Sequence, residues 1–155
     1  TYNLGASDGF VASLDLLPDG VFFFGGSTPG CGGPLVIGVN SAAQLGNASF
    51  AVTCANGPPT APGVLGFSAA KFPTAVTIYN LEVWIDFLSP AFFVVPAATN
   101  GVGAASVPLA VPNNPALVGT PVYAQFAFLG PNSPSPPCPA SGLSSSGGLE
   151  INAIP

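Results

Sequence analysis

The sequence contains no histidine and a single basic side chain, Lys71, and charged residues make up 5% of its 155 residues. An average soluble domain has about 25% charged residues. Binding of nucleic acid needs Lys and Arg to neutralise phosphates, and docking to anionic lipid needs the same side chains. The formal net charge of -5 therefore excludes both kinds of partner.

The absence of histidine also limits catalytic chemistry. The usual Ser and Cys nucleophiles need a neighbouring base, and Lys71 in SAAKFP is more typical of a solvated loop. Glu82 and Asp86 share one face of a predicted strand, but four residues at about 3.3 Å each separate their Cα atoms by about 13 Å. Paired glycosidase carboxylates lie about 5 to 9.5 Å apart, so we predict that the chain is not an enzyme.

Neither a membrane span nor a metal site is expected. A transmembrane helix needs about 18 consecutive apolar residues, and Pro or Gly interrupts each apolar run, as in AFFVVPAATNG. No Cys and His spacing suits zinc, and Asp15 and Asp19 lack the dense Asp, Asn and Gly spacing of a calcium loop. The sequence therefore implies no cofactor.

Three cysteines, Cys31, Cys54 and Cys138, fit an oxidising compartment in which one pair forms a disulfide. Their spacing does not choose among the three pairings. The chain starts at Thr1 rather than Met, so we expect a secreted protein, extracellular or on the cell surface, whose signal peptide has been removed. Asn47 begins the sequon NAS, which is either an N-glycosylation site or a chance triplet in a turn.

Short runs rich in Val, Ile, Phe and Thr are separated by turn clusters along the whole chain, while helix periodicity is nearly absent. This pattern predicts an all-β fold, a β-sandwich of the Greek-key or jelly-roll kind. We expect strands over 9–17, 20–25, 34–39, 48–54, 62–68, 74–79, 81–88, 91–97, 103–110, 120–129 and 147–153. No internal repeat divides the chain.

Two of these runs alternate clearly enough to assign their faces. The rows expected in the core are Phe50, Val52 and Cys54 in the first run, and Val122, Ala124, Phe126 and Phe128 in the second. Tyr123 and Gln125 then point outward, to solvent or to a neighbour. Between the strands, Asn114 followed by Pro115 predicts a helix cap and one helical turn, and residues 129–148 read as a Pro, Ser and Gly-rich loop.

Trp84 is expected on the outward face between Glu82 and Asp86. One interpretation is a carbohydrate-binding site, in which the ring stacks on a sugar and the carboxylates accept hydroxyl protons. The other is that Trp84 packs against a neighbouring strand, loop or subunit. The sequence leaves both open.

From GCGG at residues 30–33, through LGNASFAVTCANGPPTAPGVLGFS and VPNNPALVGTPVYAQF, to the closing GLSSSGGLEI, the chain resembles a known kind of domain. It is a Gly/Pro-rich β domain of unassigned activity that recurs, often at the C-terminal end, in large secreted proteins of bacteria. The resemblance covers residues 30–155. It implies an extracellular β-sandwich and assigns no catalytic residue.

Residues 1–26 stand outside this resemblance and form a predicted N-terminal arm, followed by a sandwich domain over 27–155. Two strand-forming runs of the arm flank the turn Pro18-Asp19-Gly20, and an isolated hairpin is marginal in water, so both must dock on a sheet. The side chains expected to do so are Phe10, Leu14, Leu16, Phe22 and Phe24.

The arm either completes the sheet of its own chain or adds strands to the next copy, as in donor-strand fibre subunits, which it resembles in this respect. The second alternative predicts a homopolymer, a filament or surface layer built by self-assembly. The rival hypothesis is a secreted glycan-binding or adhesive module that uses Trp84.

Overall fold

The structure is a computed structural model that describes residues 18–130 and 141–155. These residues form eleven β-strands and one short 3₁₀ helix, so the chain is all-β, as the sequence predicts. The predicted strand over 9–17 lies outside the described residues. The elements are β1 (Val21–Phe24), β2 (Val36–Val39), β3 (Ala51–Ala55), β4 (Pro62–Ser68), β5 (Lys71–Ile78), β6 (Leu81–Ile85), β7 (Phe93–Ala98), β8 (Ala105–Pro108), η1 (Pro115–Leu117), β9 (Pro121–Leu129), β10 (Leu143–Ser145) and β11 (Gly148–Asn152).

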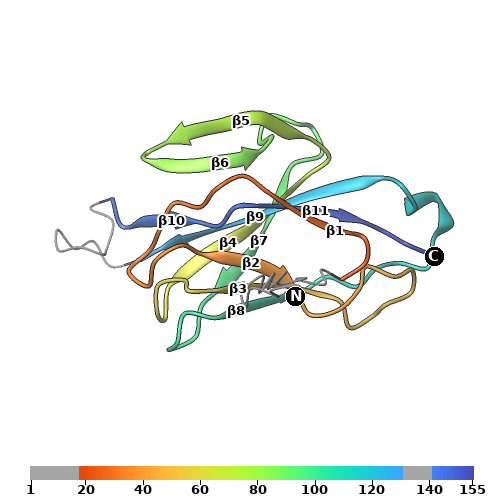
Figure 1. The fold of residues 1–155 in the computed structure, drawn as a ribbon, viewed down its shortest axis with the longest axis horizontal. Coiled ribbons are helices and arrows are strands. Elements are labelled where there is room, and N and C mark those ends of the chain that lie inside the picture. Colours follow the sequence, from red (N-terminus) through yellow and green to blue (C-terminus); the bar gives the residue numbers. More distant parts are fainter. Residues whose placement is uncertain (1–17, 131–140) are drawn as a thin grey trace, which may run out of the picture.

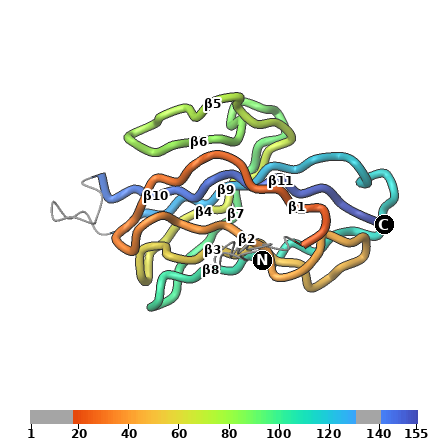
Figure 2. Tube along the Cα trace, in the orientation of Figure 1, coloured from red at the N-terminus to blue at the C-terminus, as the bar shows by residue number. Residues whose placement is uncertain are grey.

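The strands form three antiparallel sheets. The large sheet has the order β1-β11-β9-β4-β7, with β10 also paired to β9. A three-stranded sheet has the order β2-β3-β8, and β5 and β6 form a two-stranded hairpin. Figures 1 and 2 show the hairpin on one side of the large sheet and the three-stranded sheet on the other. The large sheet therefore has a neighbour on each face.

One hydrophobic cluster joins the large sheet to the three-stranded sheet. Both predicted core rows belong to it: Phe50 and Val52 of the first row are fully buried, as are Phe126 and Phe128 of the second. Burial contributes about 1.5 to 3 kcal/mol for each such side chain. The ring of Phe128 covers Gly63 on the neighbouring strand β4, where a Cβ atom would collide with it.

The outward row of β9 is covered rather than exposed, because the β5–β6 hairpin lies over it. Gln125 is 4% exposed. Its Nε2 donates to the Glu82 carbonyl at 2.8 Å, and its Oε1 accepts from the Trp84 N–H at 2.8 Å. The hydroxyl of Ser145 donates to the same Glu82 carbonyl at 2.9 Å. Side chains of the large sheet therefore satisfy the backbone of β6 that faces away from β5.

The turn between β5 and β6 consists of Tyr79 and Asn80, with φ values of 50° and 64°. Two consecutive residues with positive φ are typical of the tight hairpin turns that match the twist of the strands. The two predicted strands over 74–79 and 81–88 are thus one hairpin, whose second strand ends at Ile85.

The predicted helical turn is confirmed: the Asn114 side chain accepts a hydrogen bond from the Ala116 N–H at 3.1 Å, and Pro115 begins η1. The predicted loop over 129–148 is wrong in part, because β10 lies within it. Serine gives little strand signal, yet Ser144, Ser145 and Ser146 are all buried against β9 and the hairpin.

Two of these serines form a matched pair for a test of buried hydroxyls. The Ser146 hydroxyl accepts from the Phe126 N–H at 3.0 Å and donates to the Gly147 carbonyl at 2.7 Å. The Ser144 hydroxyl is buried with no hydrogen-bond partner among the described residues.

We therefore expect Ser146→Ala to lower the free energy of unfolding by about 1 to 3 kcal/mol, because it leaves the buried Phe126 N–H without an acceptor. Ser144→Ala should leave stability unchanged or raise it. Urea denaturation of the two variants measures both effects. An equal loss in the two variants would contradict this account of the serine run.

Candidate functional site

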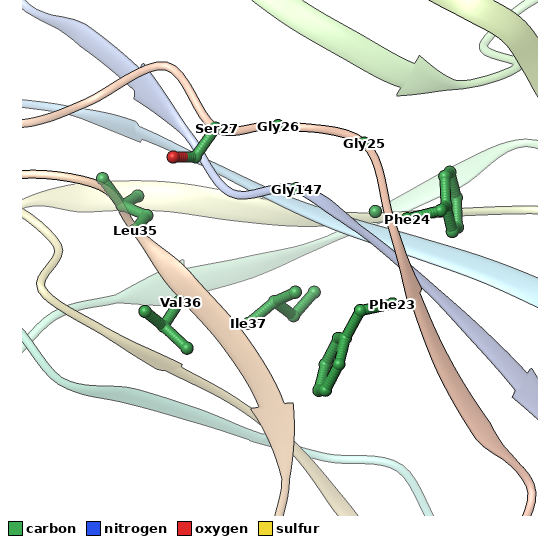
Figure 3. Close-up of a pocket in the computed structure, with 10 residues that line it drawn as sticks. Phe23, Phe24, Gly25, Gly26, Ser27, Leu35, Val36, Ile37 and Gly147 are labelled. Carbon is green, nitrogen blue, oxygen red and sulfur yellow. The ribbon is translucent and has the colours of Figure 1, made fainter. Parts of the chain in front are cut away.

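A groove of about 380 Å³ opens between β1 and β2, the edge strands of the two larger sheets. Figure 3 shows the Phe23 ring between the two strands, on the side of Ile37 of β2, whereas the Phe24 ring points to the other side of β1. Leu35 and Val36 complete its apolar wall. The groove is thus an opening between the edges of two sheets, lined by apolar side chains of which Phe23 and Val36 are exposed.

Hydrogen bonding shows which backbone groups of β1 face outward. The Asn152 N–H donates to the Gly20 carbonyl at 2.7 Å, so the alternate residue Phe22 also bonds toward β11. Val21 and Phe23 then turn their N–H and C=O groups away from β11. Among residues 18–130 and 141–155, no strand pairs with this outer edge.

The outer edge of β2 is arranged in the same way. The Asn40 N–H donates to the Ala51 carbonyl at 3.1 Å, which directs the backbone groups of Val39 and Ile37 away from β3. β2 begins beside the large sheet, where Leu35 bridges to Ser146, and Figure 3 shows β1 and β2 on opposite sides of the groove. Two outward-facing edges therefore border one groove.

The faces of β1 differ from the expectation for the arm. Val21 is 2% exposed and belongs to the core, so Phe23, two residues later, is on the same face, yet it stays 45% exposed at the groove. Phe22, expected to be buried, is 55% exposed and lies with Phe24 on the outer face. The strand pairs with β11 of its own chain. The other predicted arm residues, Phe10, Leu14 and Leu16, lie outside the described residues.

The single cation holds the outer face of β1. Lys71 Nζ lies 3.0 Å from Glu150 Oε2 of β11, 4.4 Å from the ring centroid of Phe24 and 5.1 Å from that of Tyr123. The two rings meet edge to face at 5.8 Å. Cation–π contacts and one ion pair thus join β5 to β1, β9 and β11.

Glu150 also accepts a hydrogen bond from Asn152 Nδ2 at 3.1 Å. Burial tends to raise the pKa of Glu150, but the hydrogen bonds from Asn152 and Lys71 and the Lys71 charge outweigh it and lower the pKa below its ordinary value. The ionised form is therefore the one that the folded protein favours.

Trp84 lies against the backbone that follows β1. Its Nε1 donates to the Gly26 carbonyl at 2.9 Å, and a Cβ atom at Gly25 would collide with its ring. The N–H and part of the ring are thus occupied within the chain, which supports the packing alternative for this residue.

The two carboxylates expected beside Trp84 do not form one site with it. Asp86 Oδ1 accepts from the Leu88 N–H at 2.9 Å, in the turn after β6. The carboxylate of Glu82 approaches Gly26, while its backbone N–H donates to Thr28 Oγ1 at 2.8 Å. Asp86 thus caps its own turn, while Glu82 joins β6 to the segment that follows β1.

Asn47 of the sequon is a hydrogen-bonding centre of its loop. Its Nδ2 donates to the Ser41 hydroxyl at 3.0 Å and to the Ala42 carbonyl at 2.9 Å. Its Oδ1 accepts from the N–H and the hydroxyl of Ser49. A glycan on Nδ2 would replace one of these protons, so the fold supports the interpretation of NAS as a turn.

Two further apolar cavities lie elsewhere in the described residues. One of about 210 Å³ separates the β5–β6 hairpin from the large sheet; Gln125 and Ser145 at its border already have partners. Another of about 260 Å³ opens beside Phe93, between the large sheet and the segment around η1. Both cavities are lined in part by the edge strand β7, but this strand contains Pro96, in contrast to β1 and β2.

Among the described residues, no three His, Cys, Asp or Glu side chains are grouped so that they could hold a metal ion. Within the same residues, no helix has the length and apolar character needed to cross a membrane.

The pH dependence of stability should reflect the Lys71–Glu150 pair. Because the pKa of Glu150 is lowered in the folded state, its contribution is present above the unfolded pKa and is lost as the pH falls through the folded pKa. Urea denaturation should show wild type more stable than Glu150→Gln by up to about 1 kcal/mol at neutral pH.

The same difference should vanish in acid, and Glu150→Gln should have little effect in a Lys71→Met background, which is the matched control. A difference that persists unchanged at low pH, or that is independent of Lys71, would show that the charge of Glu150 is not responsible.

The state of Cys54 narrows the choice of disulfide pairing that the sequence left open. Cys54 is a free thiol, 3% exposed, and burial raises its pKa to about 12. Of the three pairings, only Cys31 with Cys138 then remains, and Cys138 lies outside the described residues. A protonated, buried thiol is inert, so iodoacetamide should label Cys54 only after unfolding.

Trypsin can test the pairing, because the chain has one basic residue and hence one cleavage point, after Lys71. A Cys31–Cys138 disulfide should hold the two fragments of the denatured, unreduced chain together until a reductant is added. Fragments that separate without reductant would disprove this pairing.

Comparisons with known proteins give no relative from which a function could be transferred: no family model matches the chain, and no curated protein or solved structure matches it. The resemblance of residues 30–155 to a secreted β domain stays a prediction. The function must therefore be inferred from the geometry of the chain itself.

Proposed function

We propose that this protein is a non-enzymatic, extracellular structural protein whose copies assemble into a filament or surface layer through β-strand addition. The observation that carries the proposal is the pair of outward-facing edges at β1 and β2, with the groove between them. An open edge offers main-chain hydrogen bonds, and adjacent pockets take alternate side chains of an added strand.

The other strand edges carry features that prevent such pairing. Proline and lysine protect edges, because proline has no N–H and a charge resists burial. β7 contains Pro96, β8 ends in Pro108, and β5 contains Pro73. β6 is capped by side chains of the large sheet.

β1 and β2, with the sequences VFFF and VIGV, contain neither proline nor charge. Their exposed side chains are apolar: Phe22 is 55% exposed and Val36 is 56% exposed. A protein that stays monomeric would be expected to carry proline or charge at β1 and β2, as it carries proline at β7 and β8. The contrast supports an interface at β1 and β2.

In this proposal the large sheet and the three-stranded sheet are the two layers of a β-sandwich, and the added strand extends them at one side. The shared core, with Phe126 on one sheet and Phe50 on the other, supports this arrangement. A contact between two different surfaces of identical subunits repeats without closing, unless a ring forms. The proposed partner is another copy of the chain. Because the added strand and the accepting edge are different surfaces, repeated addition gives an open filament.

The native mass of the full chain tests the proposal. We expect sedimentation to show particles many times heavier than the 15.2 kDa chain. Phe23→Lys should reduce them to monomers, because it places a charge at the unprotected edge. Val102→Lys puts the same charge on a loop residue that is 82% exposed and should leave the mass unchanged.

Circular dichroism shows whether both variants keep the strand content of the wild type. A wild-type chain that stays monomeric at all concentrations would refute the proposed function.

A further inference from the structure

We infer that the groove between β1 and β2 accepts residues 9–17 of a second copy of this chain, which enter as an added strand; the inference rests on the proposed function. The contact has an acceptor and a donor. The acceptor is formed by Phe23 of β1 with Val36 and Ile37 of β2. The donor is the part of the predicted arm that precedes the turn at Pro18.

Phe23 shows that the groove is an incomplete part of the core. It is on the same face as Val21, which is 2% exposed, but Phe23 itself is 45% exposed, because β1 and β2 have separated at this point. Because the gain is proportional to the apolar area buried, a fully buried aromatic side chain contributes about twice as much to stability as one left half in water. Apolar side chains placed between Phe23 and Ile37 would complete the burial.

Four of the described residues at the border of the groove have no side chain that could do so. Gly25, Gly26, Gly147 and Gly148 form part of its border. A Cβ atom at Gly148 would collide with the Phe24 ring, and one at Gly25 with the Trp84 ring. These glycines leave bare backbone along the groove, which suits the close approach of another strand.

Residues 9–17, GFVASLDLL, have the alternation of a strand with one apolar face. That face carries Phe10, Ala12, Leu14 and Leu16. The opposite face has Ser13 and Asp15 at its centre, with Val11 and Leu17 on either side of them. The segment contains no proline, so all its backbone N–H groups are available for pairing.

The turn that precedes β1 is fixed to both sheets. The Asp19 carbonyl accepts from the Ala43 N–H, in the connection between β2 and β3, and the Gly20 carbonyl accepts from Asn152. These bonds hold the turn at Asp19 and Gly20 in place, so residues 1–17 leave the described structure from a fixed point at the start of β1. The 17 residues before Pro18 can extend over up to about 55 Å, enough to reach a neighbouring molecule.

Cysteine cross-linking between two different full-length variants tests this contact. Leu14→Cys marks the donor and Val36→Cys marks the acceptor. When the two variants are co-expressed and treated with a short bis-maleimide, we expect a cross-linked species of twice the 15.2 kDa chain mass. Leu14→Cys with Val102→Cys, equally accessible but on a loop remote from the groove, should give none.

Each outcome bears on one proposal. Particles of high mass without the Leu14–Val36 cross-link would overturn this inference and leave the proposed function standing, with another contact responsible. A third variant carries both Leu14→Cys and Val36→Cys in one chain. If the cross-link forms only within this chain, the segment fills its own groove, which also overturns the inference. Monomeric wild type overturns the proposed function itself.

Discussion

The need to give every buried backbone group a partner, in a chain with one basic side chain, governs much of this structure. Neutral side chains connect the strands and sheets through hydrogen bonds, a role that ion pairs often have in more highly charged proteins. Gln125 is the clearest case: its amide bonds to Glu82, Trp84 and Ser146, and so attaches the β5–β6 hairpin to the outer face of the large sheet. A leucine at this position would leave the Trp84 N–H without its acceptor, and the Glu82 carbonyl with Ser145 as its one remaining donor.

The small number of charged side chains also affects how the edges of the sheets are protected. Proteins often protect a free edge with lysine, but here Lys71 is committed to Glu150 and to the rings of Phe24 and Tyr123. Proline protects the other edges instead, at Pro96 and Pro108. The β1–β2 side has neither kind of protection. The functional proposal depends on this difference between two sides of one molecule.

Much of the fold could be predicted from the sequence, because alternation determines which face a strand buries. Val122 through Phe128 and Phe50 through Cys54 were assigned to their correct faces on that basis alone, and β4 has the predicted bounds. The three serines of 144–146 could not be found in this way, since their burial depends on hydroxyl bonds to distant strands. For the same reason Trp84 gave no sign that it would cover Gly25, which is far away in the sequence.

The candidate site was predictable only in part. The sequence indicated that residues 1–26 carry apolar strands that must dock, but VFFF has no polar residue to show which face is inward. The structure resolves this ambiguity through pairing: Val21 opposite Ile151 turns Phe23 toward the core. The groove itself exists because β1 and β2 belong to different sheets and lie apart. The sequence contains no local signal for how the two sheets are placed relative to each other.

The position of β11 has a consequence for the order in which the molecule can form. β11 lies between β1 and β9, so the first described strand pairs with nearly the last residues of the chain, Val21 with Ile151. A chain still emerging from the ribosome has no β11, and β1 then has no strand to join. Closing such a long-range pairing is slow. The large sheet therefore lacks its pairing between β1 and β11 until residues 148–152 have been synthesised.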